Sequence, residues 1–94
     1  MALGPLKKQI LFHRRRANTL TRIATRCHFR ARDVGRRALV AKGNGFHGHA
    51  KHLLERALRL KARATRAAVR ARIHFRQIAG LRQARRLYMQ RHAG

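Results

Sequence analysis

The sequence predicts an all-α protein of extended, non-globular helices joined by an irregular, glycine-rich basic segment. Apolar residues recur at three-to-four spacing over long stretches of the 94 residues, and the chain contains only one proline. The composition is 45% hydrophobic, but much of this is alanine and there is no tryptophan. Because alanine removes little surface from water, we expect no self-sufficient globular core and a protein that is ordered by its partner.

The first helix is expected at about residues 5–28. Pro5 suits the first helical turn, where its missing N–H is not needed. Apolar side chains then follow at near-helical spacing: Leu6, Ile10, Ala17, Leu20, Ala24 and Cys27.

Residues 29–49 are expected to be the irregular segment, because four glycines fall there: Gly35, Gly43, Gly45 and Gly48. Glycine also allows a backbone to approach a phosphate closely. We therefore expect residues 42–52 to make the most intimate contact with a nucleic acid.

The long helix is expected at 50–79, ended by Gly80 and followed by a short helix at 81–92. Its apolar stripe consists of Ala50, Leu53, Leu54, Ala57, Leu60, Ala64, Ala67, Ala71, Phe75 and Ile78. A second stripe, on another face, consists of Arg56, Arg59, Arg63, Arg66 and Arg70. We identify no internal repeat of fixed period.

The charge of the chain indicates a polyanionic partner. Lys and Arg number 25, against two acidic residues, Asp33 and Glu55, for a net charge of +23. Such self-repulsion opposes a compact free state. Arg outnumbers Lys by 20 to 5, and the guanidinium group contacts phosphate bidentately and stacks on bases. Without acidic residues to space the charges, a merely solvated helix face is disfavoured, and nucleic acid is the expected partner.

No catalytic or metal site is predicted. Asp33 and Glu55 are isolated, and no phosphate-loop pattern occurs. The candidate zinc ligands are Cys27-His28 and the group His47, His49 and His52. They include only one thiolate, which lies among many cations, so no zinc is expected. These histidines are interpreted as RNA contacts. We therefore expect no enzyme activity, no cofactor and no small-molecule substrate. No stretch reaches the roughly 20 apolar residues of a membrane span.

Aromatic residues beside cations are candidates for base stacking: Phe12, Phe29, Phe46, Phe75 and Tyr88. For Phe75 a place in the core is the favoured interpretation. Phe29 and Phe46 fall in the segment expected to be irregular, where stacking on RNA bases is favoured.

The segment Ala41-Lys42-Gly43, followed by Gly45-Phe46-His47-Gly48-His49-Ala50-Lys51-His52, resembles the L-twenty family of the large ribosomal subunit. That family has Ala-Lys-Gly-Phe/Tyr-Arg-Gly-Arg-x-Lys-Asn between a basic helix and a long helix. Phe46, Gly48 and Lys51 match, whereas histidines replace Arg, Arg and Asn and two residues are inserted. A second family signature, Arg-x-Leu-Trp-Ile-x-Arg, is similar to residues 85–91 or, in another register, to residues 73–78; the family's Trp and Tyr-rich stretch are absent.

A rival resemblance is to the L-thirty-five family, carried by Gly43-Asn44-Gly45 and His52-Leu53-Leu54. Either resemblance implies a structural protein of the large subunit that binds rRNA beside neighbouring ribosomal proteins. A mitochondrial ribosome is the expected location, with a plastid or the bacterial cytoplasm as alternatives. The first 32 residues, acid-free and Arg-rich, also resemble a mitochondrial presequence, although they are expected to be retained. The alternative function is a histone-like or protamine-like DNA compactor.

The residues expected to bind RNA combine the basic clusters, the arginine stripe and the glycine-rich segment. They are Arg14, Arg15, Arg16, Arg30, Arg32, Arg36, Arg37, Lys42, Phe46, His47, His49, Lys51, His52, Arg56, Arg59, Arg63, Arg66, Arg70, Arg82, Arg85 and Arg86.

Overall fold

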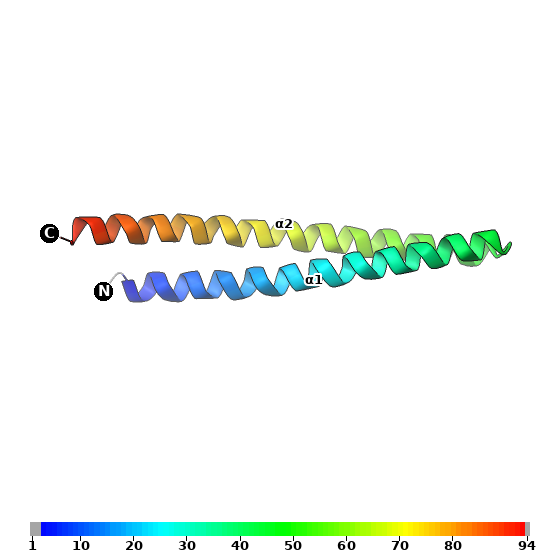
Figure 1. The fold of residues 1–94 in the computed structure, drawn as a ribbon, viewed down its shortest axis with the longest axis horizontal. Helices are drawn as coiled ribbons and strands as arrows, with labels where there is room; N and C mark the ends of the chain where they lie inside the picture. The colour runs from blue at the N-terminus through cyan, green and yellow to red at the C-terminus, as the bar shows by residue number, and fades with distance from the viewer. Residues whose placement is uncertain (1–2, 94) are drawn as a thin grey trace.

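The computed structural model describes residues 3–93 as two long helices lying side by side. Helix α1 spans Leu3–Gly43 and helix α2 spans His47–Arg91, with a turn of three residues, 44–46, between them. The helices are antiparallel, so the start of α1 and the end of α2 lie at one end of the molecule (Figure 1). The resulting hairpin measures 75 × 15 × 12 Å. The predicted all-α, extended fold class is therefore confirmed.

A seven-residue repeat holds the two helices together. Buried and half-buried side chains alternate at spacings of three and four residues from Leu6 to Ala41 in α1 and from Ala50 to Tyr88 in α2. This 3.5-residue period is that of a coiled coil, and it implies a left-handed supercoil. The expectation of no fixed repeat was wrong. The repeat is only seven residues long, and many of its core positions are alanine, which gives a weak hydrophobic signal.

Alanine occupies one of the two core positions over four consecutive repeats in each helix. These residues are buried or half-buried, and they are Ala17, Ala24, Ala31 and Ala38 in α1 and Ala50, Ala57, Ala64 and Ala71 in α2. A methyl group fills little space, so the helix axes must lie near the short end of the usual range, at about 8 Å. Larger side chains complete the seam: Leu20 packs with Ala67 and Ala71, and Val34 belongs to one cluster with Leu53.

The turn ends α1 through a left-handed glycine. Gly45 has φ +83°. The amide of Phe46 donates to the carbonyl of Ala41 at 2.9 Å, and the amide of Gly45 donates to the carbonyl of Lys42 at 3.1 Å. This pair of bonds is the Schellman motif, which satisfies the last carbonyls of a helix. Phe46 then opens α2 by accepting from the amide of Ala50 at 2.9 Å.

The expected irregular segment at 29–49 was wrong for most of its length. Residues 29–43 are helical, because Ala31, Val34, Ala38 and Ala41 continue the buried seam. The seam outweighs the helix-breaking tendency of the glycines, so that the hairpin needs only three residues outside its helices.

The expected break at Gly80 and the separate helix at 81–92 were also wrong. Helix α2 is continuous through Gly80, where Ile78 and Leu81 keep the seam closed on either side. Two members of the predicted apolar stripe lie outside the seam: Leu54 is 52% exposed and Phe75 is 47% exposed.

Glycine is required at position 45 and dispensable at position 80, which gives a matched pair of variants. Gly45→Ala should lower the free energy of unfolding by about 1–2 kcal/mol, because a Cβ is strained at positive φ. Gly80→Ala should raise it by about 0.5–1 kcal/mol, because a Cβ there meets nothing within 4 Å and alanine favours helix. Thermal melts followed by circular dichroism in concentrated salt, which screens the cations, measure both. Equal effects of the two changes would contradict the assigned turn.

Candidate nucleic-acid interface

The arginine stripe predicted on α2 lies on one exposed face of that helix. Each member directly precedes a seam residue of α2, and successive members are three or four residues apart. All are exposed: Arg56, Arg59, Arg63, Arg66 and Arg70. The side chains that would otherwise neutralise them are absent from this face, since Glu55 lies on a different, outward position of the heptad.

Helix α1 extends this basic surface across the seam. Ile23, Arg26, Arg30 and Arg63 line one shallow hollow. A second hollow is lined by Ile23, Arg63 and Arg70, together with Leu20, Arg66 and Ala67. We call the combined surface the arginine face, made up of Arg16, Arg26, Arg30, Arg56, Arg59, Arg63, Arg66 and Arg70.

The arginine face is a surface of like charge whose acidic neighbour, Asp33, is already paired with Arg37. Coiled coils usually place interhelical pairs of opposite charge beside the seam, whereas here arginines approach it from both helices. Within residues 3–93 the structure contains one ion pair, between Arg37 and Asp33 at 3.2 Å, and it joins two exposed residues of α1. Two unit charges about 4 Å apart repel by about 1 kcal/mol in water and more near a protein surface. Phosphates bound between the arginines would convert this repulsion into attraction.

The other predicted basic residues are spread around the rod. Arg37 directly precedes the seam residue Ala38, as Arg30 precedes Ala31, and so lies beside the arginine face, paired with Asp33. Arg14, Arg15, Arg32 and Arg36 of α1 are exposed on other faces. They therefore do not join a single site.

A separate basic hollow lies near the open end of the hairpin. Arg82, Arg85 and Arg86 line it with Ala79 and Met89, and its volume is about 590 Å³. The Nε of Arg85 is buried there without a hydrogen-bond partner.

The turn gathers the remaining predicted contacts at the tip of the hairpin. They are all exposed and comprise Lys42, Phe46, His47, His49, Lys51 and His52. Helix α2 begins here with no side-chain cap and no acidic residue in its first turn, an arrangement that leaves amide groups free for an anion. Only Gly45 needs its positive φ; Gly43 and Gly48 are helical, so their expected role in close approach to RNA stays a prediction.

The aromatic candidates lie apart along the rod. Phe29 and Phe46 are 61% and 63% exposed and are free to stack on bases. The core position favoured for Phe75 was wrong, because this residue is one position past the seam residue His74. Tyr88 is half-buried, with its ring 4.3 Å from that of His92 between centroids.

The candidate zinc ligands are far apart. Cys27 is buried in the middle of α1, whereas His47, His49 and His52 lie in the first turns of α2, which pack beside Ala38 and Ala41 near the end of α1. Eleven residues of α1 separate Cys27 from Ala38, about 15 Å at 1.5 Å per residue. Across residues 3–93, no three potential metal ligands of the His, Cys, Asp or Glu type lie together.

Two features were missed at the sequence level. Arg26 belongs to the arginine face: it follows Ile23 by three residues and precedes Arg30 by four, a spacing that places the three side chains on one face of α1. His13 and His74 meet in the seam, with their Nδ1 atoms 2.8 Å apart and the ring of Phe12 edge-on to both. One ring must donate and the other accept, so at least one imidazole is neutral. Only the antiparallel register brings these histidines together.

Comparison with known proteins gives no family for the chain: no family model, no curated protein and no solved structure matches it. Among the described residues, neither helix contains a stretch apolar and long enough to cross a membrane.

The histidine pair makes the open end of the hairpin sensitive to acid. Burial lowers the pKa of His74 from 6.5, and the charges of His13, Arg16 and Arg70 lower it further. Below about pH 6.5 the unfolded chain therefore binds the proton more readily than the hairpin does, and stability falls as pH falls towards the folded pKa. Unfolding titrations at about pH 7.5 and about pH 5 should show this decrease. His74→Leu should reduce it and His52→Gln, an exposed control, should not; an unchanged pH dependence in His74→Leu would refute the assignment.

Proposed function

We propose that this hairpin is a non-catalytic protein that binds rRNA. In this proposal it is a structural constituent of the large subunit of the mitochondrial ribosome. The observation that carries the proposal is the arginine face, which spans both helices and none of whose eight arginines forms an ion pair within residues 3–93. Such a surface is destabilising in a free protein and stabilising once phosphates occupy it.

The geometry suits recognition of a phosphate backbone. Arginines alternate along a rigid rod, so each guanidinium can contact a different phosphate with its planar fork. Contacts of this kind fix position and orientation but do not read sequence, and the deep, narrow major groove of A-form RNA excludes side-chain readout. The hairpin would therefore recognise the shape of folded RNA and neutralise closely packed strands.

The ribosomal part of the proposal has a narrower support. The residues that resemble the L-twenty family, from Lys42 to His52, lie together at the tip, on an exposed turn between two basic helices. A tip of this kind can insert between RNA helices while the rod lies along them. The mitochondrial location rests on the acid-free, arginine-rich N-terminal segment, which resembles a mitochondrial presequence.

A DNA compactor is the second candidate, favoured by one observation. Exposed arginines such as Arg15, Arg36 and Arg76 lie away from the arginine face, so the rod has cations around its circumference. A rod of this kind could bridge two duplexes, as a histone-like protein would.

The arginine face should dominate the salt dependence of RNA binding. Changing Arg59, Arg63 and Arg66 together to Gln should reduce the slope of log affinity against log salt by about 0.7–0.9 for each phosphate that the variant no longer neutralises. Filter binding to structured rRNA fragments over a salt series measures the slope.

The matched control removes equal charge elsewhere, by changing Lys61, Arg72 and Arg76 to Gln; all three lie outside the arginine face. The control should lower the slope by less than the face variant. Identical slopes would mean that the protein acts as a diffuse polycation, and the proposed face would be rejected.

Sedimentation of the endogenous protein separates the two candidate functions. The ribosomal proposal predicts co-migration with large ribosomal subunits, released by high salt because phosphate contacts carry the binding. Co-migration with nucleoids or chromatin after ribonuclease treatment would support the DNA compactor and contradict the ribosomal proposal.

A further inference from the structure

An apolar groove lies near the tip, on the flank of the helix pair away from the arginine face. Lys42 and Gly35 directly follow the seam residues Ala41 and Val34, whereas Arg16 and Arg30 directly precede seam residues. In a coiled coil these two kinds of position lie on opposite sides of the seam. The groove has a volume of about 500 Å³, which lies within the usual range of ligand clefts, about 300–1,000 Å³.

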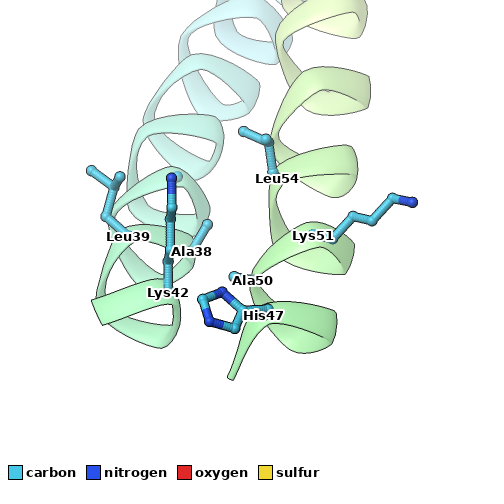
Figure 2. Close-up of a pocket in the computed structure, with 8 residues that line it drawn as sticks. Ala38, Leu39, Lys42, His47, Ala50, Lys51 and Leu54 are labelled. Atoms are coloured by element: carbon cyan, nitrogen blue, oxygen red, sulfur yellow. The ribbon is translucent and has the colours of Figure 1, made fainter. Parts of the chain in front are cut away.

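The groove has an aliphatic floor and a cationic rim. Its floor includes Ala38 and Leu39 of α1 with Ala50 and Leu54 of α2. Leu39 is 71% exposed and Leu54 is 52% exposed, so the hairpin itself leaves this apolar surface uncovered. Figure 2 shows Leu54 directed from α2 toward the space between the helices, while the ammonium group of Lys51 extends outward. Lys42 and His47 complete the rim, and no acidic residue lines the groove.

We propose that this groove binds an acidic amphipathic helix of a partner protein. Leucine-like side chains of that helix would fill the aliphatic floor, and its flanking carboxylates would face Lys42 and Lys51. Helix-in-groove recognition uses this combination of spaced apolar anchors and complementary charge. The inference goes beyond the proposed function, because it assigns a protein partner to one flank and leaves the arginine face free for nucleic acid. Lys42, His47 and Lys51 belong both to the groove rim and to the tip, so a bound helix and RNA at the tip would compete for these three residues.

Gly35 gives an independent reason to expect an occupant. It lies in the middle of α1 and lines the groove, although glycine inside a helix costs about 0.5–1 kcal/mol relative to alanine. A Cβ at this position would meet nothing within 4 Å, and φ is not positive. The hairpin therefore does not require glycine here. What glycine provides is depth in the groove beside Ala38, where an incoming side chain can reach the backbone of α1.

The lining favours a helix over a nucleotide. Bases bind single-stranded sites mainly by stacking on aromatic rings, and none of the residues that line the groove is Phe, Tyr or Trp. The groove also follows α1 from Gly35 to Lys42, which is about two helical turns or 10 Å. That length accommodates anchors spaced at i, i+3 or i+4, and i+7 on a partner helix.

The test uses the full chain and a fluorescent synthetic peptide that carries leucines at helical i, i+3, i+4 and i+7 positions among glutamates. Because any acidic peptide is attracted to a +23 protein, the control is a scrambled peptide of the same composition. Anisotropy titrations should give at least about tenfold tighter binding of the amphipathic peptide, the equivalent of about 1.4 kcal/mol. Equal affinities for the two peptides would overturn the proposal.

Two groove variants and one control locate the binding. Gly35→Leu fills the groove while favouring helix, so it should weaken binding of the amphipathic peptide at least about tenfold. Gly80→Leu makes the same change at an exposed position outside the groove and should leave peptide binding unchanged. Leu54→Gln alters the floor at an exposed site and should also weaken binding, which makes the result independent of position 35. Circular dichroism verifies that each variant is helical, and unchanged peptide binding in both groove variants would refute the proposal.

Binding of structured RNA by the same variants separates this inference from the proposed function. RNA affinity and its salt slope should be unchanged in Gly35→Leu and Leu54→Gln. If both variants weakened RNA binding and left the peptide unaffected, the groove would belong to the nucleic acid and the proposal would be wrong. Loss of RNA binding in the arginine-face variant tests the proposed function and has no bearing on the groove.

Discussion

The alanine-lined seam between α1 and α2 is the contact on which the rest of the structure depends. It holds two strongly basic helices along a rod of 75 Å, although each alanine contributes only a small apolar area. Its strength comes from repetition, since buried positions recur through nearly the whole length of both helices. Small side chains also bring the backbones close, which increases dispersion contacts between them.

The seam also determines on which face of the hairpin the remaining side chains lie. With most core positions taken by alanine and larger apolar residues, nearly all the cations are left on outward and flanking positions; Arg85 is the half-buried exception. The two flanks differ in character: arginines from both helices occupy one, and the groove containing Gly35 and Leu54 interrupts the other. A two-helix protein can thereby present two chemically distinct surfaces, one suited to phosphate and one to apolar side chains.

The sequence was sufficient to predict two helical regions and an exposed arginine stripe, because Leu20, Leu53 and the Arg56–Arg70 series are strongly periodic. It misled at Gly35 and Gly80, where local glycine propensity was given more weight than the seam that continues through both positions. The groove, the arginine face across both helices and the His13–His74 pair could not be predicted, since they depend on the antiparallel register. That register is set by where the turn falls, and a single left-handed residue, Gly45, determines it.

The position of the termini has a topological consequence. Because α1 begins and α2 ends at the same end of the hairpin (Figure 1), the opposite end is the turn, and no chain segment leaves the hairpin there. A folded RNA could receive this rod tip-first into an existing gap, without either polymer having to be threaded through the other. The same geometry means that adjoining segments, wherever they lead, emerge on one side of such an insertion. For the rRNA partner that we propose, late addition to a largely folded RNA and removal from it would thus both be sterically simple.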